Sequence, residues 1–213
     1  MIPKIIAPIL MFLSIGVSTP DVKPIVPQLM AAKEISLDNR YSNSYVSDIF
    51  KDNILLNLAY LSGKVSKAAD VNWDEIKKPI KYTFFLQPGK TFAFHDDVLP
   101  EYADSVVLTT RAHFNFAEGF KSDGYLAGDG VCHLASLMYW AAKEAGLDTY
   151  APTSHDFMPI PGIPKEYGVS IYSTPGQSAS NARQNLYIRN NHKEPVIFAF
   201  SYDGESLKFT VEK

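Results

Sequence analysis

The chain has 213 residues, of which 46% are hydrophobic and 20% are charged, which is the balance of a globular protein with one core. Its 20 lysines and arginines and 23 acidic residues are spread along the chain and give a formal net charge of -3. Because no basic stripe could follow a phosphate backbone, nucleic acid is excluded as a partner.

The first 19 residues predict an export signal. Lys4 precedes an apolar run from Ile5 to Val17, and Pro8 interrupts that run. The run is shorter than the roughly 20 residues that cross a bilayer as a helix, so a cleaved signal peptide is expected. The alternative is an uncleaved membrane tether through residues 1–19, and in both cases the rest of the chain is extracytoplasmic. The proline-rich residues 20–33 predict an extended spacer, followed by a single domain over 34–213.

The folded part is expected to be α+β, with antiparallel strands and a C-terminal β-meander packed against two main helices. Hydrophobic periodicity and turn residues give its elements. In chain order these are a strand at 34–37, a helix at about 45–62 capped by Ser44, a hairpin turning at Pro88–Gly89, a strand at 104–110, a hairpin turn at Asp123–Gly124, a helix at about 131–145, a proline-rich loop at 153–168 and a meander over 186–211.

The helix over 131–145 carries Cys132, the only cysteine of the chain, in its first turn. One side of this helix is an apolar stripe, and the semi-polar face opposite holds Cys132, Ser136, Tyr139 and Lys143. Free backbone N–H groups and the positive end of the helix dipole favour a thiolate there. Without an intramolecular disulfide partner, this cysteine is either a reactive group or a small packing residue.

The turn before this helix is rich in glycine. Gly128 and Gly130 allow a close backbone approach and a sharp entry into the helix, and Asp129 is a candidate cap. These glycines lack the order of a phosphate-binding loop, so no cofactor is expected.

A nucleophilic cysteine needs a base, and two histidines are candidates. His133 points about 100° away from its neighbour Cys132 on a helix, whereas the proline-fixed loop can fold His155 back over the helix start. Asp156 or Glu166 would orient the His155 imidazole. The alternative for His155 is a structural hydrogen bond. Because Cys132 and His133 diverge, a zinc site is not expected.

The segment GDGVCHLASLMYWAAKEAGL, residues 128–147, resembles the cysteine signature of the VanW family. Similar segments flank it, namely LQPGKTFAF upstream and SHDFMPIPGIPKEYGVSI and NLYIRNNHKEPVIFAFSYDGESLKF downstream. The resemblance covers about residues 34–213. It implies a protein of the bacterial cell envelope, because members of this family are associated with that location.

The resemblance also carries over to single positions. It places Cys132 on the family cysteine, His155 on a loop histidine, Glu166 on an acidic position and Tyr139 on a tyrosine. The chain departs from the family at His133, which stands in place of glutamine, at Ala135, which replaces serine, and at Trp140, which replaces asparagine.

Together these observations favour a thiol hydrolase or acyltransferase that acts on an envelope peptide such as peptidoglycan. Cys132 would be the nucleophile, His155 the base and Glu166 the orienting acid. The residues expected to support the site or to line its cleft are Gly128, Asp129, Gly130, His133, Ser136 and Tyr139. The alternative is a non-catalytic module that binds cell-wall peptide or glycan.

Overall fold

The computed structural model describes residues 27–124 and 127–213. The expected export signal at 1–19 and the first part of the expected spacer lie outside the described residues. Within the described ranges, no helix has both the length and the apolar character needed to span a bilayer.

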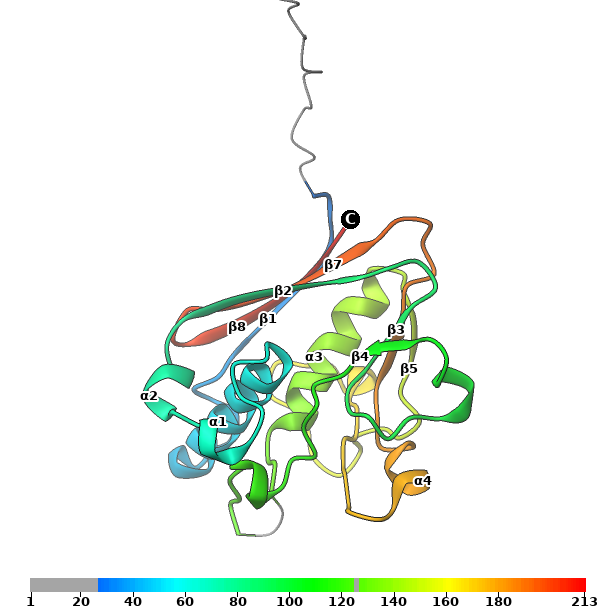
Figure 1. Ribbon diagram of the computed structural model, residues 1–213. Coiled ribbons are helices and arrows are strands. Elements are labelled where there is room, and N and C mark those ends of the chain that lie inside the picture. The colour runs from blue at the N-terminus through cyan, green and yellow to red at the C-terminus, as the bar shows by residue number, and fades with distance from the viewer. Residues whose placement is uncertain (1–26, 125–126) are drawn as a thin grey trace, which may run out of the picture.

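The described chain forms two four-stranded sheets around two long helices (Figure 1), which confirms the predicted α+β class. The large sheet has the order β1-β8-β7-β2 and the small sheet the order β4-β3-β6-β5. The elements are β1 (Leu29–Ser36), α1 (Ser44–Leu61), α2 (Trp73–Ile76), β2 (Ile80–Leu86), β3 (Thr91–Ala93), β4 (Val106–Leu108), α3 (Val131–Glu144), β5 (Asp148–Tyr150), α4 (Ser178–Asn181), β6 (Tyr187–Arg189), β7 (Val196–Tyr202) and β8 (Ser206–Glu212).

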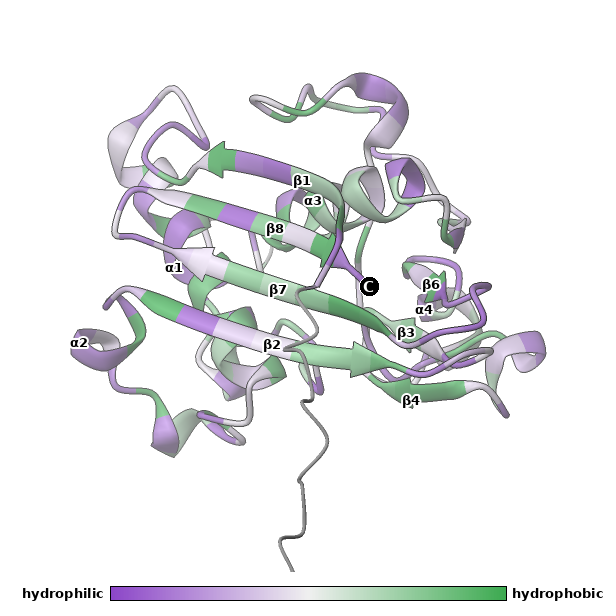
Figure 2. Ribbon diagram, turned by 90° about the horizontal axis from the view of Figure 1, so that it is seen from above, coloured by the Kyte–Doolittle hydropathy of each residue, from purple (hydrophilic) through white to green (hydrophobic). Residues whose placement is uncertain are grey.

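The large sheet covers one side of the molecule, and α3 packs beneath it against β1 and β8 (Figures 1 and 2). Every second residue of β7 faces this core and is buried, as the period of a strand with one buried face requires. The Phe198 ring stacks on Phe84 at 4.9 Å, and the Phe200 ring lies 4.6 Å from that of Phe209. These aromatic contacts join three neighbouring strands into one core face.

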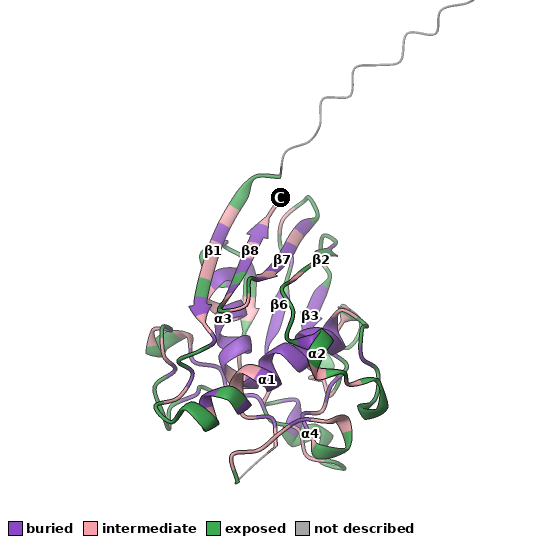
Figure 3. Ribbon diagram, turned by 90° about the vertical axis from the view of Figure 1, so that its left-hand side faces the viewer, coloured by how far each residue is buried: buried purple, intermediate pink, exposed green. Residues whose placement is uncertain are grey.

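Helix α1 lies beside α3 and is buried along most of its length (Figure 3). It begins at Ser44 because the Oδ1 atom of Asn43 accepts hydrogen bonds from the N–H groups of Tyr45 and Val46, at 3.0 and 3.3 Å. The cap is thus Asn43 and not Ser44 as predicted. Both main helices match their predicted ranges to within one residue.

The hairpin predicted around Pro88–Gly89 is wrong, although the turn itself is present, with Gly89 at a φ of 72°. Strand β2 pairs with β7 in the large sheet, whereas β3 pairs with β6 in the small sheet. The chain therefore passes from one sheet to the other at this turn. The physical reason is that both segments find a better antiparallel partner far away in sequence than in each other.

Three other predicted features differ in extent. Strand β1 begins at Leu29, inside the expected spacer, because its first residues pair with the C-terminal end of β8, at Glu212 and Val211. Strands β7 and β8 form the final hairpin of the predicted meander, but β6 belongs to the small sheet. At the expected Asp123–Gly124 turn, a single antiparallel bridge joins Ser122 and Ala127, and residues 125–126 lie outside the described ranges.

Asn185, which precedes β6, fastens the end of β3 and the segment after it. This residue is fully buried. Its Oδ1 atom accepts from the N–H groups of Phe94, His95 and Leu186 at 2.8–3.2 Å, and its Nδ2 atom donates to the carbonyls of His95 and Asp97 at 3.0 and 2.9 Å. Both the oxygen and the nitrogen of the Asn185 amide are thus needed to satisfy the main chain of this segment.

We predict that Asn185→Asp lowers the free energy of unfolding by about 3 kcal/mol or more, because a carboxylate oxygen would face two carbonyls in a buried site. Denaturant unfolding measures this. The change Gln177→Glu is the control, because Gln177 is exposed and its side chain makes no capping bond, and it is expected to stay within about 0.5 kcal/mol of the parent. Equal stability of the two variants would contradict the role given to Asn185.

Candidate functional site

The cysteine helix α3 begins at a point of close backbone contact with α1. Gly130 is its N-cap residue, with a φ of 96°, a conformation that glycine adopts readily. A Cβ atom on Gly130 would lie 2.7 Å from the carbonyl oxygen of Phe50. The fully buried Asn53 of α1 donates from Nδ2 to the carbonyls of Asp129 and Lys121 at 2.9 and 3.0 Å. Helix α1 therefore fixes where α3 starts.

The close approach expected at the other glycine is also present. A Cβ atom on Gly128 would lie 2.7 Å from the Cβ atom of Phe114. Phe114 itself has a φ of 61°, a strained conformation for a bulky residue. The predicted cap Asp129 does not cap the helix. Its Oδ2 atom instead accepts from the N–H of Asp123 at 2.9 Å, because this bond turns the side chain back toward the preceding loop, and burial raises the pKa of its carboxyl.

The proline-rich loop folds back over the semi-polar face of α3. An antiparallel bridge between Ser154 and Val169 closes the base of the loop. The buried hydroxyl of Ser136 donates to the carbonyl of Cys132 at 2.7 Å and accepts from the N–H of Val169 at 2.9 Å. The helix face that was expected to be semi-polar is thus covered by the segment that follows the loop.

The Cys132 thiol bonds to the main chain of that segment. Its Sγ atom accepts from the N–H of Ile171 at 3.3 Å and lies 3.5 Å from the Ile171 carbonyl oxygen, to which it donates. Burial raises the pKa of the Cys132 thiol to about 11, more than the Ile171 N–H lowers it. In this arrangement the thiol is protonated at neutral pH, in contrast to the thiolate that the helix dipole alone favours.

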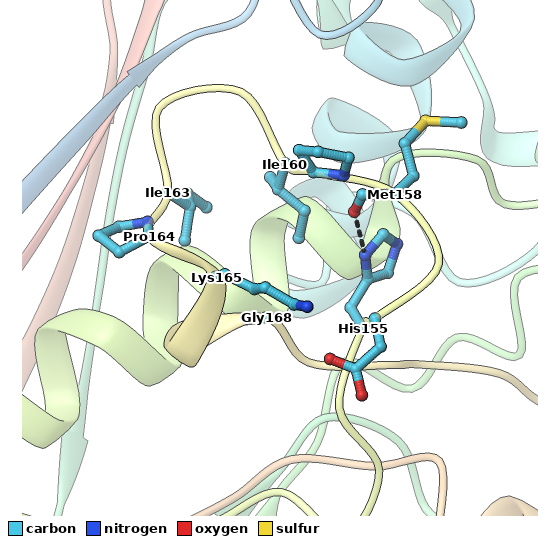
Figure 4. Close-up of a pocket in the computed structure, with 9 residues that line it drawn as sticks. His155, Met158, Ile160, Ile163, Pro164, Lys165 and Gly168 are labelled. Atoms are coloured by element: carbon cyan, nitrogen blue, oxygen red, sulfur yellow. Dashed lines mark hydrogen bonds between the residues drawn. The ribbon is translucent and has the colours of Figure 1, made fainter.

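His155 is buried in the same loop and is neutral at pH 7. Its Nδ1 atom lies 3.0 Å from the carbonyl oxygen of Met158 (Figure 4). Since a carbonyl can only accept, Nδ1 carries the proton and Nε2 is left with a free electron pair. Burial lowers the pKa of the imidazole more than the Met158 bond raises it. No hydrogen bond joins His155 to Cys132 among the residues that the structure describes.

His133, which points away from Cys132 on α3, lies against other rings. Its ring centroid is 5.0 Å from that of Phe50 and 6.3 Å from that of His155. Burial, followed by the charges of Arg40 and His155, lowers the pKa of His133 to about 3. Over residues 27–124 and 127–213, no group of three or more His, Cys, Asp or Glu side chains is placed to hold a metal ion.

Two of the predicted site residues lie away from these groups. Glu166 is exposed on the 3-10 helix Lys165–Tyr167, and the Nδ1 atom of His155, which an orienting acid would contact, is bonded to the Met158 carbonyl. Tyr139 lies further along α3, where its ring meets Tyr167 at 6.3 Å and its hydroxyl accepts from Lys143 at 3.2 Å.

A cleft of about 510 Å³ opens at the start of α3. The glycine turn and the first turn of α3 form one wall, and the folded loop and the segment 170–173 form another. It is lined by Tyr41, Phe50, Phe114, Asp123, residues 127–133, His155, Phe157, Met158, residues 170–173 and Gln184. A second cavity of about 150 Å³ is lined by Ile160 and Ile163 among others (Figure 4). His155 and Met158 line both spaces.

These features define an α+β domain in which a cysteine-bearing helix, entered through a glycine turn, is covered by a histidine-bearing loop beside an open cleft. The chain belongs to the VanW family: the family model described as VanW like protein matches residues 78–212. No curated protein and no solved structure matches the chain. The matched range contains α3, the loop and most of the cleft, whereas Tyr41 and Phe50 come from the region before it.

Several residues of the cleft were not predicted from the sequence. The main chain of Ile171 and the carbonyl of Met158 carry no side-chain signature of their roles. Phe157 and Tyr172 are 78% and 42% exposed at the cleft, but no signal in the sequence indicates this, since single exposed aromatic side chains are ordinary and a shared patch is visible only in the folded chain.

We predict that the alkylation rate of the folded chain by iodoacetamide rises about tenfold per pH unit until near pH 11, the value to which burial raises the pKa of Cys132. Cys132 is the sole thiol, so the reaction reports on this site alone. The urea-unfolded chain is the control and is expected to level off at about pH 8.5. A plateau below pH 9 for the folded chain would show that the thiolate is stabilised instead.

Proposed function

We propose that this chain is an extracytoplasmic cell-envelope protein whose cleft at the start of α3 binds a cell-wall peptide without cleaving it. The observation that carries the proposal is the open cleft of about 510 Å³ with exposed aromatic side chains at its mouth. Ligand sites are commonly concave, largely apolar and furnished with a few polar groups. The apolar run at 5–17 supports the extracytoplasmic location.

The mouth of the cleft offers contact surfaces of the kind that carry binding energy. Phe157 is 78% exposed, and its ring packs on the buried His155 at 4.1 Å, which holds it in place. Tyr172 stands on the segment that bonds to Cys132 and is also exposed. An aromatic ring that is anchored before binding loses little entropy when a ligand covers it.

The state of the thiol favours binding over catalysis. A nucleophilic cysteine acts as the thiolate, whereas burial raises the pKa of Cys132 to about 11. Its two hydrogen bonds go to the main chain of Ile171, so the sulfur ties the loop to α3.

We expect Phe157→Ala and Tyr172→Ala each to weaken co-sedimentation with purified cell walls by about tenfold, because each removes an exposed aromatic contact at the cleft mouth. Phe116→Ala is the matched control, since Phe116 is 69% exposed and does not line the cleft. Cys132→Ser, which removes the thiol but keeps a group that can bond to Ile171, is expected to retain binding. Unchanged binding by both cleft variants, or loss of binding by a folded Cys132→Ser chain, would contradict the proposal.

A second candidate function is acyl transfer or hydrolysis through Cys132, which one observation favours: Cys132, His133 and His155 all line the same cleft. The free electron pair on Nε2 of His155 could take the thiol proton once a bound peptide displaced the Ile171 contact. The thiolate would attack the amide carbonyl, His155 would return the proton to the leaving amine, and water would release the acyl group. Glu166 would need to move to contact His155.

If this second function holds, incubation of muropeptides with the protein yields new amine and carboxyl ends in mass spectra, and both Cys132→Ala and His155→Gln abolish them. His192→Gln serves as the control, because His192 does not line the cleft. Binding without any cleavage product in the parent chain would leave the non-catalytic function as the better description.

A further inference from the structure

Arg40, which follows β1, is a buried charge without an ionic partner. Its side chain is only 2% exposed. Nη2 donates to the Oδ1 atom of Asn39 at 2.9 Å, whereas Nε and Nη1 have no hydrogen-bond partner. None of the ion pairs formed within residues 27–124 and 127–213 includes Arg40. A buried charge of this kind is costly unless something compensates it.

The guanidinium lies behind one wall of the cleft. A Cβ atom on Gly162 would be 4.0 Å from Nη2 of Arg40, so the turn at Gly162 covers it from the outside. On the cleft side, the charge of Arg40 acts on His133, whose pKa it lowers together with burial. The next residue, Tyr41, lines the cleft, and Phe50 packs on both Tyr41 and His133 at 5.8 and 5.0 Å.

His133 itself presents unused hydrogen-bonding capacity at this wall. Its side chain is 95% buried, being 5% exposed, it lines the cleft, and its Nδ1 atom has no partner. Gln184 also lines the cleft, and its buried Oε1 atom has no partner, so it needs a donor, such as a peptide N–H. Buried polar atoms in native proteins are nearly always satisfied, so each such exception calls for an explanation.

We infer that the wall formed by Tyr41, Phe50 and His133 binds the free carboxylate of a peptide, with His133 donating its ring N–H and the charge of Arg40 behind it providing electrostatic compensation. A carboxylate supplies both things that this wall lacks, a negative charge and hydrogen-bond acceptors. The rest of the cleft suits a peptide chain. The carboxylates of Asp123 and Asp129 and the amide of Gln184 can accept hydrogen bonds from peptide N–H groups, and Val131, Met158 and Ile171 offer apolar contact to peptide side chains. This inference rests on the proposed function and names the ligand group.

Calorimetric titration with acetyl-trialanine as the free acid and as its C-terminal amide tests the inference. We expect the acid to bind at least about tenfold more tightly than the amide. Arg40→Met is expected to reduce this preference to about twofold or less and to raise the Tm of the ligand-free protein, because it removes an uncompensated buried charge. Arg183→Met is the matched control, since Arg183 is exposed. It should leave both the preference for the acid and the Tm unchanged.

His133→Phe provides a second variant that leaves Arg40 in place, and it should also reduce the preference for the acid. Equal affinity for acid and amide, binding of neither at millimolar concentration, or an undiminished preference in Arg40→Met would overturn the inference. Displacement of the peptide acid by a lower concentration of glucuronic acid would overturn the choice of a peptide. Failure of the proposed function is seen separately, in cell-wall sedimentation of the Phe157 and Tyr172 variants, which leave Arg40 and His133 unchanged.

Discussion

The contact between Gly130 and the main chain of Phe50 is the constraint on which the cleft depends. No side chain fits between α1 and Gly130, the N-cap residue of α3, so the two helices meet backbone to backbone at this point. The amide of Asn53 holds the approaching turn from the α1 side. With the start of α3 fixed in this way, Cys132 and His133 both line the cavity, although adjacent helical side chains point about 100° apart. The glycine turn before Cys132 is thus required, in physical terms, by the close contact between the two helices.

Local patterns predicted the helices well, and nonlocal pairing explains where prediction failed. The apolar periodicity and the terminal glycines of α1 and α3 are properties of a few turns of chain, so both helices were placed to within one residue. Strands β2 and β3 also have the right composition and a true turn between them. A short stretch of sequence does not reveal that β2 pairs with β7 and β3 with β6 in separate sheets, because strand pairing is decided by shape and burial across the whole core.

The candidate site was predicted only in part, again because local geometry can be derived from the sequence and nonlocal contacts cannot. Helical geometry was enough to place Cys132 off the core stripe and to exclude His133 as its direct partner. That the loop returns over α3 could be expected from its prolines, but which of its groups meets the sulfur could not, since Ile171 contacts it through main-chain atoms that every residue possesses. The sequence did not indicate that Arg40 is buried, because its burial arises only when the surrounding segments pack together. From the sequence alone, an arginine is expected to be a solvated charge.

The bond between Cys132 and Ile171 gives the sulfur a geometric role. Its two contacts, at 3.3 and 3.5 Å, are about half an ångström longer than hydrogen bonds between oxygen and nitrogen. The sulfur therefore fills the space between α3 and the segment that carries Ile171 and Tyr172, and it joins the two through contacts longer than those of an oxygen atom. This spacing depends on the size of the atom and is fulfilled by the protonated thiol.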